Sequence, residues 1–249
     1  MLNLVYCELM KLKRSRMLVF AVVGTWATPV MLFIEGVQQH FEQPERVVTL
    51  EHFYSNSLLY VMLIMNMMIY IAIEAYLFSR EYTERTLKNI LPLPISRVKL
   101  LLGKYFTLFL IIICLMGITW LEVLTIAGIY QLLFYVEAFK LSIALAWLLK
   151  FIVAGIVMFL TLSPFAYIAE KTKGLVIPMI AAAVIIMGSA ALCNQDLGAL
   201  YPFTAGYLLI QDKILDTGYS ISVSIGIMLV VSIVGYILTM TYFEKEDLR

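Results

Sequence analysis

The sequence predicts an all-α integral membrane protein with six transmembrane helices. Of its 249 residues, 62% are hydrophobic and 14% are charged, whereas a soluble domain has about 45–50% apolar and about 25% charged residues. The apolar residues also form long continuous runs, and a helix needs about 20 of them to cross the hydrocarbon core. Strands of a membrane barrel would alternate in polarity over about ten residues. We therefore expect one transmembrane domain over residues 1–249.

Residues 1–16 precede the first apolar run and are predicted to form a helix on the cytoplasmic surface of the membrane. Leu2, Val5, Leu9 and Leu12 recur at helical spacing, and charged residues take the other faces. The alternative is a basic flank that only sets the topology. The apolar run that follows lacks a small-residue cleavage site, which favours a retained helix over a signal peptide.

Six apolar runs are predicted to cross the membrane, and the basic residues between them define the orientation. Of the 18 lysines and arginines, 14 fall in segments that are cytoplasmic if the N-terminus is inside. We therefore predict a multi-pass protein of the plasma membrane with both termini in the cytoplasm. The predicted spans are Met17–Ile34, Leu58–Phe78, Tyr105–Ile129, Ser142–Ala169, Leu175–Cys193 and Ser220–Tyr242.

The loop 79–99, between the second and third spans, is the most informative segment. Its first half is charged on one face and suits a short cytoplasmic helix. Pro92 and Pro94 must end this helix, because proline lacks an amide donor and restricts the residue before it. Ser96 can then cap the next helix. The expected result is a rigid charged protrusion, joined by a stiff elbow to the third span. The alternative is a basic inner loop without a partner.

This loop resembles that of ABC-2 type exporter permeases, in which a Glu, Thr-Leu, Leu-x-x-Pro-Ile-Ser-Arg, Lys and Gly-Lys follow in order. The matching positions are Glu81 or Glu84, Thr86-Leu87, Leu91, Pro94 to Arg97, Lys99 and Gly103-Lys104. By size and layout the chain is most similar to the lantibiotic- and bacitracin-immunity permeases. The resemblance implies that residues 81–91 form a coupling helix that docks on a separate ATPase subunit.

The resemblance also implies which residues carry the coupling. The candidates for contact with the ATPase are Glu81, Tyr82, Glu84, Arg85, Thr86, Leu87, Lys88 and Leu91. The elbow comprises Pro92, Pro94, Ser96 and Arg97.

Two glutamates lie inside predicted spans, where a charge costs roughly 2.5–3.5 kcal/mol on insertion scales. Glu74 is either a polar contact for a substrate or a residue near the interface that is solvated or paired with Arg80. Glu122 is either a substrate contact or an interhelical hydrogen-bonding group. The segment 194–219 is apolar in its middle but too short to span, so we expect a re-entrant outer segment. The alternative is an interfacial loop anchored by aromatic residues. Candidates for the substrate path are Glu122, Tyr201 and Phe203.

Sequence motifs for catalysis, ATP binding and metal binding are absent. The chain contains no GxxxxGK[ST] motif, so a separate subunit would bind ATP and magnesium. His40 and His52 are weak evidence for a metal site. The predicted function is therefore not that of an enzyme but of the permease subunit of an ATP-driven exporter of an amphiphilic peptide antibiotic or lipid-like substrate, giving self-immunity or resistance. A secondary transporter or channel is the alternative.

Several partners follow from that function. They are ABC ATPase subunits, a second copy of this permease or a related one, and membrane lipid. No nucleic-acid partner is expected.

Overall fold

The computed structural model describes residues 2–43, 48–84, 86, 96–137 and 139–245. The regular secondary structure of these residues is helical, and they contain no β-strand. The only pairing of extended backbone among them is an isolated parallel bridge between Thr49 and Glu137. The longer helices are α1 (Leu2–Arg14), α2 (Met17–Thr25), α3 (Ala27–Glu42), α4 (Leu50–Leu59), α5 (Met65–Thr83), α7 (Arg97–Leu133), α8 (Leu141–Thr172), α9 (Val176–Leu192), α10 (Pro202–Ile210) and α11 (Ile221–Lys245).

In the described part of the chain, five helical segments are long and apolar enough to cross a membrane, and each contains or largely overlaps a predicted span. They are Met17–Glu42, Leu50–Thr83, Arg97–Leu133, Leu141–Thr172 and Ile221–Lys245. The remaining predicted span, Leu175–Cys193, corresponds to α9, which is apolar but has 17 residues. At 1.5 Å per residue α9 is about 25 Å long, somewhat less than the roughly 30 Å of a hydrocarbon core.

Two of the spans depart from a regular helix. The first is interrupted at Trp26, where α2 ends and α3 begins. The second contains a π-helical turn, η1 (Tyr60–Ile64), between α4 and α5. Such turns insert extra backbone into a helix and occur frequently at functional sites.

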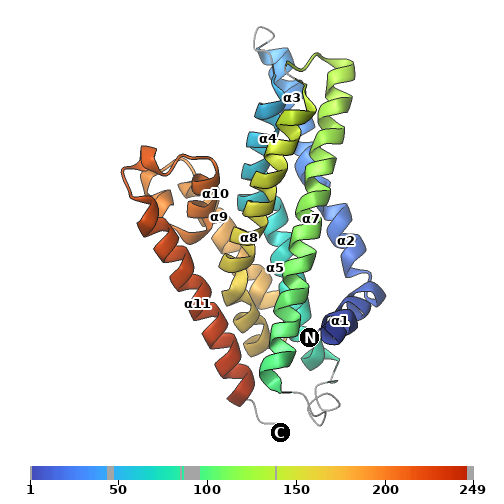
Figure 1. Cartoon of the computed structure of the whole chain (residues 1–249), viewed down its shortest axis with the longest axis vertical. Helices are drawn as coiled ribbons and strands as arrows, with labels where there is room; N and C mark the ends of the chain where they lie inside the picture. Colours follow the sequence, from blue (N-terminus) through green and yellow to red (C-terminus); the bar gives the residue numbers. More distant parts are fainter. Residues whose placement is uncertain (1, 44–47, 85, 87–95, 138, 246–249) are drawn as a thin grey trace.

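The helices stand side by side with both described ends of the chain at the same end of the bundle (Figure 1). The N-terminal end of α1, the C-terminal end of α11, the first turn of α7 and the turn between α8 and α9 lie together there. The second span is the most buried of the five, and its α5 part packs against α7, α8 and α9. Helix α11 packs chiefly on α8.

Helix α1 uses its apolar stripe for protein contacts. Val5 and Leu12 are buried, and the helix packs against α7 and α2. The approach to α7 is close, because a Cβ at Gly103 would lie 3.3 Å from Cβ of Leu4. Arg16, with a φ of 59°, makes the left-handed turn that separates α1 from α2.

The segment 194–219 folds into three short helices beside the end of α11 that is remote from the chain termini (Figure 1). They are η2 (Asp196–Leu200), α10 and η3 (Leu215–Thr217). Pro202 begins α10, where its missing amide hydrogen is not needed. Gly206 allows α10 to approach α8, because a Cβ there would lie 2.5 Å from a methyl group of Val157.

Candidate functional site

An ion cluster joins three helices at the base of the connection between α5 and α7. Glu81, near the end of α5, accepts from the Lys104 ammonium of α7 at 2.8 Å and from the Lys11 ammonium of α1 at 3.1 Å. Lys104 also donates to the carbonyl oxygen of Leu77 at 2.9 Å. Glu81 and Lys104 are 5% and 2% exposed, so both charges are shielded from water. One carboxylate therefore ties α1, α5 and α7 together.

Local helix geometry explains how these groups meet. Leu77 and Glu81 are four residues apart on α5 and so lie on one face, where a single ammonium can contact both. Helix α7 begins after Ser96, whose side chain accepts a hydrogen bond from the amide of Lys99 at 3.4 Å. This start places Lys104 two turns into α7, level with the end of α5.

Lys11 lies outside the membrane-spanning helices, and its pKa is raised. Burial alone would lower the pKa of this ammonium, but the carboxylates of Glu8 and Glu81 outweigh that effect by charge attraction and hydrogen bonding. Lys11 therefore stays protonated at neutral pH, and its contact with Glu81 is an ion pair.

The predicted coupling helix is described only at its beginning. Glu81, Tyr82, Glu84 and Thr86 are described, whereas Arg85, Leu87, Lys88 and Leu91 lie outside the described residues. Tyr82 faces the turn between α8 and α9, where the Lys173 ammonium lies 5.3 Å from the centre of the Tyr82 ring. Glu84 pairs with Arg80 at 2.8 Å on the surface.

The elbow is described at its second half, and it holds α11. Pro92 and Pro94 lie outside the described residues. The guanidinium of Arg97 donates to the carbonyl oxygens of Phe243 and Glu244 at 3.0 and 2.8 Å. The first turn of α7 is therefore attached to the last turns of α11, a contact that the sequence did not indicate.

Of the three candidates for the substrate path, Tyr201 and Phe203 lie together with their ring centres 5.6 Å apart, whereas Glu122 lies elsewhere in the bundle. Glu122 is 4% exposed and accepts a hydrogen bond from the Thr25 hydroxyl of α2 at 3.1 Å. Tyr201 donates to the carbonyl oxygen of Ile185 in α9 at 3.3 Å, and Phe203 packs edge-on against Phe165 of α8. Helices α2 and α10 stand on opposite sides of the bundle (Figure 1).

Glu74 is fully buried between α5 and α8, which excludes both solvation and the predicted pairing with Arg80. Its side chain is 0% exposed, and neither carboxylate oxygen has a partner in hydrogen-bond geometry, although the backbone of Ala166 lies nearby. Arg80 instead pairs with Glu84. The interpretation of Glu74 as solvated or paired with Arg80 is therefore wrong, because α8 packs over that face of α5.

A polar network that sequence reasoning missed lies between α3, α5 and α7. The amide of Asn66 donates to the Thr119 hydroxyl at 2.9 Å and to the Tyr70 hydroxyl at 3.3 Å. Its amide oxygen accepts from the Thr28 hydroxyl at 3.1 Å. Asn66 is fully buried and lies two residues after the last residue of the π-helical turn. The detectable signal was an asparagine inside an apolar span, where polar groups find partners on other helices.

Replacing Asn66 by alanine is expected to lower the free energy of unfolding by about 1–3 kcal/mol, because Thr28, Tyr70 and Thr119 lose a buried partner. The measurement is thermal unfolding of the full chain in detergent. The control is Gln38→Ala, which removes an exposed hydrogen bond to Glu42 and should change stability by less than about 0.5 kcal/mol. If Asn66→Ala also changes the free energy of unfolding by less than about 0.5 kcal/mol, the network contributes no measurable stability.

The fold and loop define a class of protein. Residues 4–189 match the model of the ABC-2 family transporter protein, which is more than half of the 249 residues. The chain therefore belongs to this family and is a membrane permease of an ABC transporter. Membership of the family implies that it pairs with ABC ATPase subunits.

The chain is also similar to one particular permease of an ABC transporter. Over 206 residues the chain is 28% identical to the bacitracin transport permease protein BCRB of Bacillus licheniformis. The alignment covers 83% of this chain and 97% of that protein. The similarity therefore extends over most of this chain and nearly the whole of that protein.

Proposed function

We propose that this chain is the permease subunit of an ATP-driven exporter that removes a bacitracin-like amphiphilic peptide, or a lipid-like substrate, from the membrane and so gives resistance. Family membership and the bacitracin permease relative support the transport class and the substrate class. ATP and magnesium would be bound by the separate ATPase subunit. Two permease copies, identical or related, would complete the path, because six helices form half of the usual exporter.

The observation that carries the proposal is the ion cluster around Glu81. Its three helices are the one before the loop, the one after it, and the N-terminal helix. A push on the loop would therefore be transmitted to α1, α5 and α7 together. In this proposal Glu81 is a positioning residue, because its carboxylate faces helices, while Glu84 lies at the surface for contact with the ATPase.

In the proposed orientation, the end of the bundle that carries the loop and the chain termini lies in the cytoplasm. The loop, the turn between α8 and α9, and both chain termini carry most of the lysines and arginines. In this orientation α1 would lie at the inner membrane surface and α9 would be the fifth of six spans, with its short length completed by the residues around it. The segment 194–219 would then enter the outer leaflet.

Docking of the loop can be tested by reversing two neighbouring charges. The double variant Glu84→Lys/Arg85→Glu is expected to lose at least about 90% of the ABC ATPase that co-purifies with the tagged chain from native membranes, because reversed charges at an interface cost several kcal/mol. The measurement is mass spectrometry of the purified complex. The control Glu42→Lys/Lys140→Glu alters exposed charges at the opposite end of the bundle and should retain the ATPase. Undiminished ATPase on the loop variant would refute docking at this loop.

The substrate and energy source need a second measurement. Vesicles that contain the permease with its ATPase should move bacitracin only when ATP is supplied, and cells that express both should tolerate more bacitracin. Movement of bacitracin in vesicles without ATP would instead identify a secondary transporter or channel. If the vesicles show ATP-dependent transport but bacitracin is neither moved nor stimulates that transport, the exporter class is supported and bacitracin is refuted as the substrate.

A further inference from the structure

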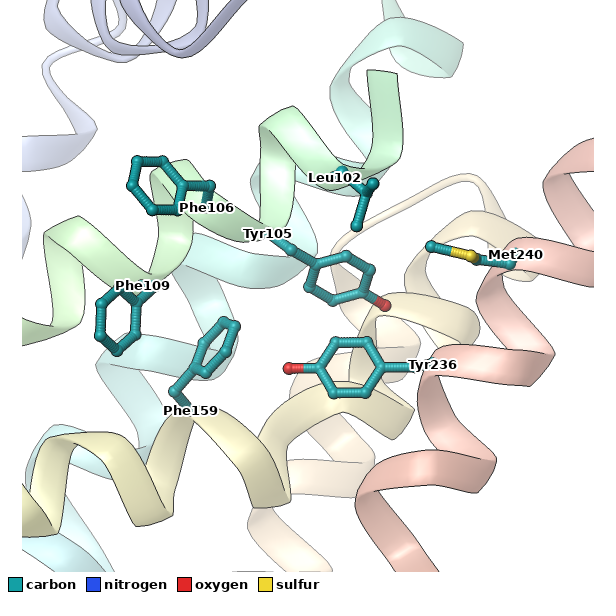
Figure 2. Close-up of a pocket in the computed structure, with 7 residues that line it drawn as sticks. All are labelled: Leu102, Tyr105, Phe106, Phe109, Phe159, Tyr236 and Met240. Carbon is teal, nitrogen blue, oxygen red and sulfur yellow. The ribbon is translucent and has the colours of Figure 1, made fainter. Parts of the chain in front are cut away.

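An apolar groove lies between α7, α8 and α11. It has a volume of about 590 Å³, which is in the range of sites that hold small molecules. The residues that line it are all uncharged, and the aliphatic and phenylalanine side chains come from all three helices (Figure 2). They are Leu102, Phe106 and Phe109 of α7, Phe159 of α8 and Met240 of α11.

Two tyrosines complete the groove. The rings of Tyr105 and Tyr236 meet edge to face with their centres 4.6 Å apart, and Figure 2 shows them between the apolar residues of α7 and α11. Phe159 lies against both Tyr236 and Phe109, at 6.2 and 5.2 Å between ring centres. The aromatic rings therefore form a continuous wall with little polar surface.

The groove lies in the leaflet that is nearer to the ends of the chain. Leu102 is five residues from the start of α7 at Arg97, and Met240 is five residues from the end of α11 at Lys245. At 1.5 Å per residue, each helix end is about 8 Å beyond the groove. Leu102 is 41% exposed. Since α7, α8 and α11 are long and apolar enough to cross a membrane, we expect the medium in front of the groove to be lipid hydrocarbon.

Basic residues surround the helix ends just beyond the groove. Lys99 and Lys245 are exposed, and Arg97 joins the two helix ends through its hydrogen bonds to the carbonyl oxygens of Phe243 and Glu244. Among the described residues at these helix ends, the exposed side chain of Glu244 opposes Arg97, Lys99 and Lys245, so the described side chains there are positive in sum. Glu246 and Asp247 follow in the sequence and lie outside the described residues. Basic positions between membrane helices at the level of the headgroups attract anionic lipids.

We propose that the groove is a binding site for an anionic phospholipid of this leaflet, with one acyl chain between α7, α8 and α11 and the phosphate against Arg97, Lys99 and Lys245. An acyl chain matches the uncharged lining, and the headgroup matches the positive helix ends. A bound lipid would contact α7 and α11 at once and reinforce the link that Arg97 makes between them. This site is separate from the proposed export function and is tested without the ATPase.

The test is native mass spectrometry of the full chain in detergent, titrated with phosphatidylglycerol or with phosphatidylcholine of the same chains. The wild-type chain should retain phosphatidylglycerol at least about fivefold better, since a basic residue near the surface contributes about 1 kcal/mol. Leu102→Trp fills the groove and should lower retention of phosphatidylglycerol at least about fivefold. The matched control is Leu110→Trp, on the same helix and 38% exposed, which should leave retention unchanged.

Charge variants separate the headgroup from the chain. Lys99→Gln/Lys245→Gln should reduce retention of phosphatidylglycerol to that of phosphatidylcholine, whereas Lys140→Gln, at the far end of the bundle, should not. If Leu102→Trp no longer gives a monodisperse protein, Met240→Trp serves as the groove-filling variant with the same expected result. Equal retention of the two lipids by the wild type, or full retention by the groove-filling variant, would overturn the proposal. Loss of a dimer with lipid retention unchanged would assign the groove to a second copy of the chain instead.

Discussion

Replacing Glu81 by glutamine is expected to lower the free energy of unfolding by about 3–5 kcal/mol, because it leaves the Lys104 ammonium buried without its counter-charge. Lys104 is 2% exposed, and the ammonium otherwise contacts uncharged groups, the carbonyl oxygen of Leu77 and the ring of Phe78. Lys11 would lose the same carboxylate but would keep Glu8. The measurement is thermal unfolding of the full chain in detergent, with ATP-driven transport as a second readout.

Two variants distinguish the lost ion pair from a general disturbance of the loop. Glu84→Gln removes an exposed ion pair three residues further along and should cost less than about 1 kcal/mol. Glu81→Gln/Lys104→Met removes both buried charges and should recover most of the stability, because an uncharged pair needs no solvation. If the double variant is as unstable as Glu81→Gln, the effect does not arise from the unpaired ammonium.

Replacing Gly235 by alanine is expected to displace α11 from α8 and to lower the free energy of unfolding by about 1–3 kcal/mol or more. A Cβ at this position would lie 2.4 Å from Oγ of Ser163, 2.6 Å from the nitrogen of Pro164 and 2.7 Å from the carbonyl carbon of Ser163. Backbone atoms cannot rotate away as the end of a long side chain can. The shift would also break the hydrogen bond from Ser163 to the carbonyl oxygen of Ser232, which is 2.9 Å long.

The matched control is on the same helix. A Cβ at Gly226 meets nothing within 4 Å, so Gly226→Ala should be neutral or stabilise the chain by up to about 1 kcal/mol through helix propensity. Thermal unfolding and the rate of proteolysis near α11 measure both variants. We expect Gly235→Ala to lower the free energy of unfolding and Gly226→Ala to leave it unchanged or raise it. If the two variants are equally stable, α8 and α11 can separate without cost.

Sequence reasoning anticipated the spans because membrane insertion depends on local composition. An apolar run of about 20 residues predicts a helix wherever its neighbours lie, since only internal hydrogen bonds satisfy the backbone in lipid. The long helices therefore include Leu58–Phe78 and Tyr105–Ile129 nearly as predicted. The run Leu175–Cys193 formed the helix α9 but a shorter one, because its end turns into the short helices that follow.

The sequence predicted which residues take part in the candidate site but not which of them contact each other. The loop pattern identified Glu81 and Lys104 separately, as a coupling residue and as part of a Gly-Lys pair. Only packing showed that they form one buried ion pair, because the partner of a side chain depends on which face of which helix lies opposite. The same reason hid the hydrogen bonds of Asn66 and the complete burial of Glu74.

The amino-acid sequence by itself determined that this protein is a helical membrane protein, because that class depends on local composition and run length. The permease class followed from the resemblance of its loop motif to the ABC-2 family, and that motif is also local. The tertiary structure alone decided that Glu81 joins three helices, that Gly235 sets the distance between α8 and α11, and that a groove opens beside Tyr105 and Tyr236. Each of these depends on contacts between residues far apart in the chain, and helical periodicity carries no information about which helices become neighbours.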